Sequence, residues 1–303
     1  MIKNKFFFFG ILISLIANFS CSHDDDSGEQ VIEQPVDNFY IESYHGFYAQ
    51  YNGSLSTFFN YSNIISFEYD NSNRIIKRNG DMFHLSPNSG GGGYLHDSLY
   101  TDLVYTNNKV HLEKKGTPLV ANYIPENETI IELDAYNRMI RKMKYNESDY
   151  PGRDTTNYTY SNGKLVSYIK TSNRVSTIGN WSVRYFEESN LYYTNDNLDS
   201  IVSIFSSKQS SVSYTIFSKK ETQYFSGYDT AENPFRKLQM FEETFNRSLS
   251  KNNFTEYRKT SNRYDYPNDN YYATPTLGPT QEIVNQTWNL AYNENGEWIY
   301  DLF

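Results

Sequence analysis

A hairpin pattern that recurs along the chain limits the fold of this sequence more than any other feature. In each copy a short alternating strand ends near a Tyr, a polar turn follows, and a second strand begins with a polar and then an apolar residue, most clearly at Phe67–Ile75, Val104–Val110 and Tyr158–Leu165. Asn and Gly tolerate the positive φ angles that tight hairpin turns require. One of these two residues stands immediately before the second strand in six copies: Asn73, Asn108, Asn137, Gly163, Asn197 and Gly296.

Apolar residues recur at a fixed distance from these turns. In the strand before the first turn, Ile65, Phe67 and Tyr69 alternate with polar residues, so one face of that strand is apolar. The pattern predicts a mainly β fold, an antiparallel meander of repeated hairpins in an open or curled sheet. We expect it to form a single domain over 39–303. The position two residues after the turn residue is Ile75, Val110, Met139, Leu165 and Trp298 in five copies, whereas Asp199 departs in the remaining one.

One segment, at about 234–248, breaks the strand pattern. Asn233 can cap a helix and Pro234 suits its first position. Apolar residues then recur every three to four positions. The spacing predicts a helix of about four turns that packs on the sheet through this stripe, which consists of Phe235, Leu238, Phe241, Phe245 and Leu249.

The first twenty residues have the composition of a secretory signal peptide. Lys3 and Lys5 precede an apolar run from Phe6 to Ile16, which is too short for a spanning helix, and the small residue Ser20 ends the segment. The only cysteine, Cys21, comes directly afterwards and has no second cysteine to pair with. We expect Cys21 to carry a lipid anchor; the alternative is a buried or incidental thiol. Several acyl chains on one residue are sufficient for stable membrane attachment.

An acidic run follows the cysteine, with Ser22 and then Asp24, Asp25 and Asp26. This arrangement resembles the Bacteroidota-type lipoprotein signal in which acidic residues behind the lipidated cysteine direct export to the outer face of the outer membrane. The resemblance implies a lipid-anchored, surface-exposed protein with a flexible acidic tether over 21–38. The alternative is that the three aspartates form only a solvated tether.

A second resemblance lies further along the chain, at Tyr228-Asp229 and Asn233-Pro234-Phe235. These residues look like the signature of Bacteroidota surface lipoproteins of unknown function that carry YD-type β-hairpin repeats. The likeness spans roughly 60–303 and implies the same hairpin architecture. True YD repeats carry Gly more regularly at the turn, where four of the six copies here have Asn, and this departure favours an open or curled sheet over a closed shell.

Composition and motifs exclude several functions. With 27 Lys+Arg against 36 Asp+Glu, the chain lacks the basic face that nucleic-acid binding needs. Its five histidines show no metal-binding pair spacing, and no nucleotide or nucleophile motif occurs, so we expect no metal, no cofactor and no catalytic residues. Three carboxylate pairs, at Glu187-Glu188, Glu242-Glu243 and Asp265/Asp269, leave open a second hypothesis, a surface polysaccharide hydrolase.

Aromatic residues reach 17%, and 29 of them are Tyr. This tyrosine-rich chain therefore has enough aromatic side chains to supply a binding surface in addition to its core. Flat rings stack on sugars or anchor a protein partner, so the leading hypothesis is a non-catalytic binding or structural module for a glycan or an envelope protein. Because neighbouring strand residues face opposite ways, one Tyr of each adjacent pair should be exposed. The alternative is that the tyrosines merely cover a thin sheet. The predicted ligand platform comprises Trp181, Trp288, Trp298, Tyr193 and Tyr272.

Overall fold

The computed structural model describes residues 41–45, 64–84, 93–116, 128–146, 152–175, 182–287, 289–292 and 298–299. The expected signal peptide, Cys21 and the acidic tether therefore lie outside the described residues. The strands are β1 Ser43–His45, β2 Ile64–Tyr69, β3 Ile75–His84, β4 Gly93–Thr106, β5 Lys109–Gly116, β6 Glu128–Leu133, β7 Met139–Asn146, β8 Gly152–Ser161, β9 Lys164–Val175, β10 Ser182–Thr194, β11 Asn197–Gln209, β12 Ile216–Ser226, β13 Glu256–Asp265, β14 Thr276–Leu277, β15 Gln281–Thr287, β16 Ala291–Tyr292 and β17 Trp298–Ile299. The helical turns are η4 Pro234–Lys237, α2 Phe245–Ser248 and η5 Pro267–Asp269.

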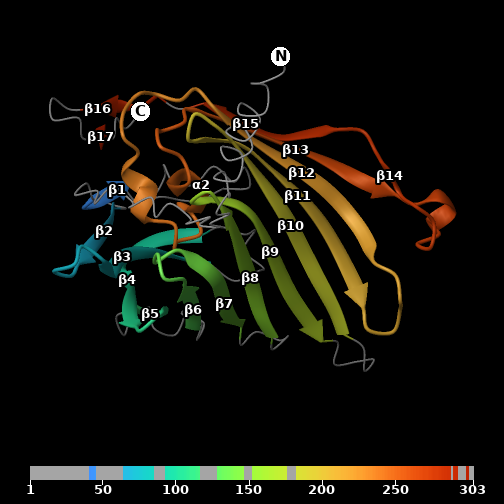
Figure 1. Ribbon diagram of the computed structural model, residues 1–303, viewed down its shortest axis with the longest axis horizontal. Helices are drawn as coiled ribbons and strands as arrows, with labels where there is room; N and C mark the ends of the chain where they lie inside the picture. The colour runs from blue at the N-terminus through green and yellow to red at the C-terminus, as the bar shows by residue number, and fades with distance from the viewer. Residues whose placement is uncertain are drawn as a thin grey trace, which may run out of the picture. The chain divides into compact units, whose positions relative to one another are not determined.

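The predicted fold class is confirmed. Strands β1 to β14 pair in sequence order, each antiparallel to the next, and β15 adds to β13, which gives a 15-stranded sheet. Figure 1 shows this order as a continuous run of colour across the sheet. Among the described strands β1 pairs only with β2, so the sheet is open. A separate two-stranded hairpin joins β16 to β17.

The turn chemistry that the sequence predicts is observed at three of the six predicted residues. Asn73, Asn137 and Gly163 have φ angles of 57°, 60° and 75°, in the left-handed region. In the turn between β4 and β5, the left-handed residue is Asn107 rather than the predicted Asn108. Gly296 lies outside the described residues. Asn and Gly at chain reversals thus produce the successive hairpins.

The prediction for the β10–β11 turn is wrong by one position. Asn195 and Asp196 supply the positive φ angles, 52° and 65°, whereas Asn197 is already the first residue of β11 and is buried. The apolar position two residues after the turn is then Leu198, which is fully buried, and not Asp199. The apparent exception to the pattern disappears because Asp, like Asn, tolerates the left-handed region.

Two buried clusters cover one face of the sheet. One includes Ile65, Phe67 and Val110, and the other includes Leu165 and Ile201. The residues between them in each strand face the opposite side, as the period of two requires. Alternation in the sequence therefore located the dry face correctly.

The connection between β12 and β13, residues 227–255, lies over this dry face; we call it the crossover segment. Phe235 contacts Tyr44 of β1 with ring centroids 5.3 Å apart, and Phe241 contacts Phe67 of β2 at 5.7 Å. Phe245 packs on Tyr158 of β8 at 5.9 Å. The segment thus covers strands from β1 to β8, and Figure 1 shows it as the orange chain around α2.

The prediction of one continuous four-turn helix in this segment is wrong, although its apolar stripe packs on the sheet as expected, with Phe235, Leu238 and Phe241 buried and the other two residues partly buried. Only the short turns η4 and α2 are helical. Between them Thr244 Oγ1 donates to the carbonyl of Leu238 at 2.7 Å, so a side chain satisfies a carbonyl that a helix would have used. The stripe also divides between the two clusters, since Phe235 and Leu238 join one and Leu249 joins the other, which requires the chain to bend.

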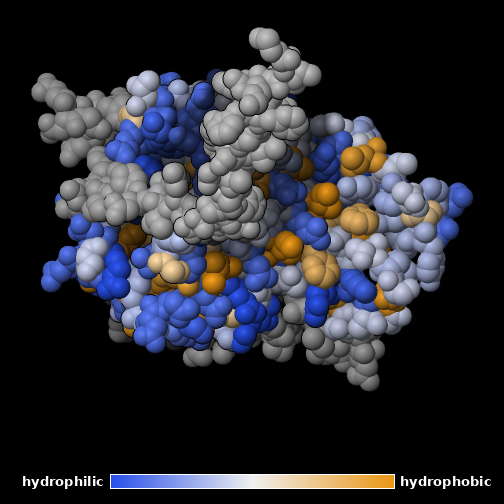
Figure 2. All heavy atoms as spheres, viewed as in Figure 1, coloured by the Kyte–Doolittle hydropathy of each residue, from blue (hydrophilic) through white to orange (hydrophobic). Residues whose placement is uncertain are grey.

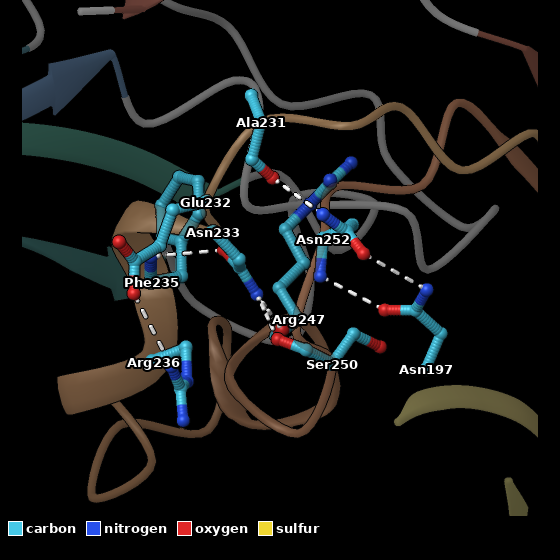
Figure 3. A network of polar contacts seen from close by, with 9 residues as sticks. All are labelled: Asn197, Ala231, Glu232, Asn233, Phe235, Arg236, Arg247, Ser250 and Asn252. Carbon is cyan, nitrogen blue, oxygen red and sulfur yellow. Dashed lines mark hydrogen bonds and ion pairs between the residues drawn. The ribbon is translucent and has the colours of Figure 1, made fainter. Parts of the chain in front are cut away.

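Asparagine side chains hold the crossover segment together (Figure 3). Asn233 Nδ2 donates to the carbonyls of Arg247 and Ser250 at 2.6 and 2.9 Å, while its Oδ1 accepts from the Phe235 amide at 3.0 Å. Asn252 donates from its backbone amide to Asn197 Oδ1 at 2.8 Å. The misassigned Asn197 therefore serves to attach the crossover segment to β11.

Candidate functional site

The signature residues that resemble YD-repeat lipoproteins have structural roles. Tyr228 Oη donates to the Leu198 carbonyl, and Asp229 Oδ1 accepts from the Asn253 amide at 3.1 Å. Asn233 caps η4, with Pro234 in its first turn, and Phe235 is fully buried. Because every one of these side chains is used to fix the crossover segment, this motif does not itself form a binding site.

Tyrosines at the hairpin ends are also mainly structural. Arg74 lies over the Tyr105 ring at 4.5 Å and Arg138 over the Tyr160 ring at 4.7 Å, so each arginine links its turn to the next hairpin. Burial raises the pKa of both Tyr105 and Tyr160 to about 12. These rings fill the edge of the core, which supports the view that most tyrosines cover the sheet.

Charged side chains join the crossover segment to the strands beneath it. Glu243 Oε1 lies 2.5 Å from Nη2 of the buried Arg78, whose Nη1 lies 3.2 Å from Asp81 Oδ1. Glu242 lies 3.5 Å from Lys142 Nζ and remains 65% exposed. The charge of Lys142 lowers the pKa of Glu242 to about 2. These contacts fix the position of the segment electrostatically as well as by packing.

Two of the three carboxylate pairs found in the sequence, Glu242-Glu243 and Glu187-Glu188, are not arranged as a glycosidase centre. General acid catalysis needs a carboxyl group with a raised pKa, but that of Glu242 is lowered and Glu243 is bound by Arg78. Glu187 and Glu188 are consecutive in β10 and pair with Lys170 and Ile169, so they point to opposite faces. The side chain of Asp269 lies outside the described residues.

Of the five predicted platform residues, the structure describes only the side chains of Tyr193 and Tyr272, and these two do not lie together. Tyr193 is half-buried in the second core cluster, with Lys164 Nζ 5.6 Å from its ring centroid. Tyr272 is 79% exposed and lies beyond the other end of the β10–β11 hairpin. Trp181 and Trp288 lie outside the described residues, as does the side chain of Trp298, whose backbone belongs to β17.

Tyr272 instead belongs to a cluster of four tyrosines that we call the tyrosine tip: Tyr214, Tyr266, Tyr271 and Tyr272. Tyr214, from the β11–β12 connection, lies 4.6 Å from Tyr272 and 6.5 Å from Tyr271 between ring centroids. The Tyr214 and Tyr271 rings are almost parallel, at 6°. Tyr266 packs edge-on against Tyr271 at 5.0 Å. Two chain segments about fifty residues apart in sequence thus build one aromatic surface.

The tip is attached to the sheet by backbone and side-chain hydrogen bonds. Tyr266 Oη accepts from the Phe217 amide at 2.6 Å, which joins the segment after β13 to the start of β12. The Tyr272 amide donates to Asn270 Oδ1 at 3.1 Å and shapes the turn between the rings. Tyr271 is 43% exposed and neither core cluster includes a tip residue. The tip rings are therefore fixed in position by the sheet while part of their surface remains exposed to solvent.

Exposure of the adjacent tyrosine pairs agrees only partly with prediction. In β10, Tyr192 is 52% exposed while Tyr193 is half-buried, as alternation requires. At the tip both Tyr271 and Tyr272 are exposed, because they lie in a turn rather than in a strand. Tyr214 and Tyr266 were not among the predicted platform residues. One feature of the sequence could have indicated them. Aromatic residues occur both in the reversal after β11 and in the reversal after β13, which fall at the same end of neighbouring strands.

The described residues also bear on metal binding and on membrane insertion. Within the described ranges, no cluster of three or more His, Cys, Asp or Glu side chains is placed to hold a metal ion. In the same part of the chain, no helix has both the length and the apolar character needed to cross a bilayer.

The fold and the tip together define a mainly β protein, an antiparallel meander with an exposed tyrosine cluster at one end of its long hairpins. No protein-family model matches the sequence, and no curated protein is detectably similar to it. Among solved structures, the chain is similar to a porin-like protein from Bacteroides vulgatus ATCC 8482, at 11% identity and a TM-score of 0.37, over 70% of this chain and 84% of that chain. A likeness at this level supports no functional inference.

Proposed function

We propose that this chain is a non-catalytic lipoprotein of the outer-membrane surface that binds a glycan through the tyrosine tip. The tip is the observation that supports the proposal. Exposed aromatic side chains normally occur singly on a protein surface, whereas here four rings contact one another outside both cores. Aromatic faces pack on the C–H faces of sugars, and tyrosine hydroxyls can bond to sugar hydroxyls.

Replacing both exposed tip rings tests the binding role. In the Tyr271→Ala/Tyr272→Ala variant we expect at least about a tenfold loss of affinity for any glycan that the protein binds on a glycan array, because an aromatic stacking pair contributes about 0.5–1.5 kcal/mol beyond area burial. Both side chains are exposed, so the circular dichroism spectrum and melting temperature should be unchanged.

The matched control is a second pair of exposed tyrosines away from the tip. Tyr136, in the β6–β7 turn, and Tyr192 of β10 are 43% and 52% exposed, and Tyr136→Ala/Tyr192→Ala should bind as the unaltered protein does. If the control pair weakens binding as much as the tip pair, or if no glycan binds at all, the proposed site is wrong.

The membrane anchor belongs to the same proposal and rests on the sequence alone. Cys21 directly follows an apolar signal segment, and Asp24–Asp26 resemble an export signal to the cell surface. An anchor at the end of a tether would place the tyrosine tip outside the cell, where polysaccharides are accessible.

Two sets of substitutions test this localisation. Cys21→Ala should abolish labelling with a palmitate analogue and release the protein from the membrane fraction, since the acyl chains supply the attachment. Asp24→Ala/Asp25→Ala/Asp26→Ala should remain acylated but become resistant to protease added to intact cells. Normal acylation or membrane retention of the Cys21 variant would contradict lipid anchoring, and unchanged protease sensitivity of the aspartate variant would contradict the export role.

A further inference from the structure

Building on the proposed glycan-binding role of the tyrosine tip, we infer that its ligand is a neutral polysaccharide rather than one that carries carboxylate or sulfate groups. The inference concerns the polar surroundings of the rings, which are independent of the rings themselves. Stacking on an aromatic face does not distinguish a neutral sugar ring from a charged one. The charged groups beside that face then decide whether acidic sugars are accepted.

The sequence around the tip contains no cation. From Gln209 to Ile216 and from Asp265 to Thr280, the only charged residues are Asp265 and Asp269, and there is no Lys, Arg or His. The chain as a whole is 21% charged, so these two stretches are unusually neutral. The nearest basic residues along the chain, Lys208 and Arg263, belong to strands β11 and β13.

Hydroxyl and amide groups take the place of charges. Exposed Ser213, Asn268, Asn270 and Thr274 lie between or beside the four tyrosines in these stretches. Such groups both donate and accept hydrogen bonds, as sugar hydroxyls do. Figure 2 shows the consequence: the end of the molecule around β14 is mostly pale, whereas the surface over β2 to β7 is largely deep blue.

The strands near the crossover segment differ from the tip in that they carry basic side chains. Lys142, Lys144 and Lys114 lie on strands β5 and β7, where they pair with the carboxylates of Glu242 and Asp81. These three lysines are therefore already paired within the protein. The two tip stretches carry two aspartates and no Lys, Arg or His, so they supply no counter-charge that would compensate the desolvation of an acidic polymer.

Pairs of polymers that share one backbone test the inference. The full-length protein is run in native gels that contain a neutral polysaccharide, such as a glucan or a mannan, or the carboxymethylated form of the same polymer. We expect retardation by a neutral polymer, with at least about tenfold weaker binding of its carboxymethylated form. Binding to the neutral polymer should change little between about 0.02 and 0.5 M NaCl, because no ion pair is formed.

A gain-of-function variant sharpens the test. Ser213 and Thr274 are exposed beside the tip, and Ser213→Lys/Thr274→Lys should raise affinity for the carboxymethylated polymer and make that binding salt-dependent. If the unaltered protein prefers the acidic polymer and loses it in Tyr271→Ala/Tyr272→Ala, the neutral class is wrong while the glycan-binding site stands. If neither polymer class is bound, or if only a protein partner is, the proposed function itself fails.

Discussion

Replacing Phe235 by Ala is expected to lower the free energy of unfolding by about 3–5 kcal/mol, the usual cost of truncating a fully buried Phe. Phe235 is completely buried and lies edge-on to Tyr44 at 5.3 Å. The two rings connect the crossover segment to β1, a strand of three residues at the edge of the sheet. Loss of this contact removes buried area and a packing contact of β1 beyond its pairing with β2. Urea unfolding followed by intrinsic fluorescence measures the effect.

Hydrogen exchange gives a second readout for the same variant. The Phe235 amide still donates to Asn233 Oδ1, so η4 should persist while amides in β1 exchange faster. Tyr192→Ala is the control, since that ring is 52% exposed and its removal should change stability by no more than about 0.5 kcal/mol. A cost at Phe235 as small as that of the control would falsify the view that the crossover segment is part of the core.

The hairpin architecture could be predicted from the sequence because its determinants are local. Positive φ at Asn73, Asn137 and Gly163 depends on the residue itself, and the two-residue period depends only on which face of a strand is dry. The turn at Asn195-Asp196 was misplaced because three consecutive residues, through Asn197, are all suited to turns. Hydrogen bonds to the distant Asn252 decide that Asn197 belongs to the strand.

The crossover segment and the tyrosine tip could not be predicted in the same way, because both depend on contacts between distant parts of the chain. The spacing of Phe235, Phe241 and Phe245 suits a helix, yet these rings contact strands β1, β2 and β8. The tip joins Tyr214 to Tyr272 through pairing of β12 with β13. Neither local sequence by itself shows that these two reversals meet, so Tyr214 and Tyr266 were not predicted.

Replacing Arg78 by Met should cost about 3–5 kcal/mol, because it removes a buried cation that pairs with two carboxylates and leaves Glu243 without its partner. Arg78 is buried between Asp81, at 3.2 Å, and Glu243, at 2.5 Å, and its guanidinium lies 5.2 Å from the Phe241 ring centroid. Met retains most of the apolar volume, so packing alone does not explain such a loss. Lys109→Met supplies the comparison: Lys109 pairs with Glu132 at 3.2 Å on the surface, and its removal should cost less than about 1 kcal/mol.

A second substitution separates the loss of charge balance from the loss of contacts. In Arg78→Met/Glu243→Gln the carboxylate of Glu243 is neutralised, while Asp81 keeps its contact with Lys114 at 2.8 Å. If the uncompensated charge is the main cost, the double variant should recover more than half of the stability that the single variant loses in urea unfolding. A double variant no more stable than Arg78→Met would show instead that the contacts of the guanidinium itself, with Asp81 and Phe241, attach the crossover segment to β3. The expected recovery follows because a buried ion pair is far more costly to break on one side than to remove from both.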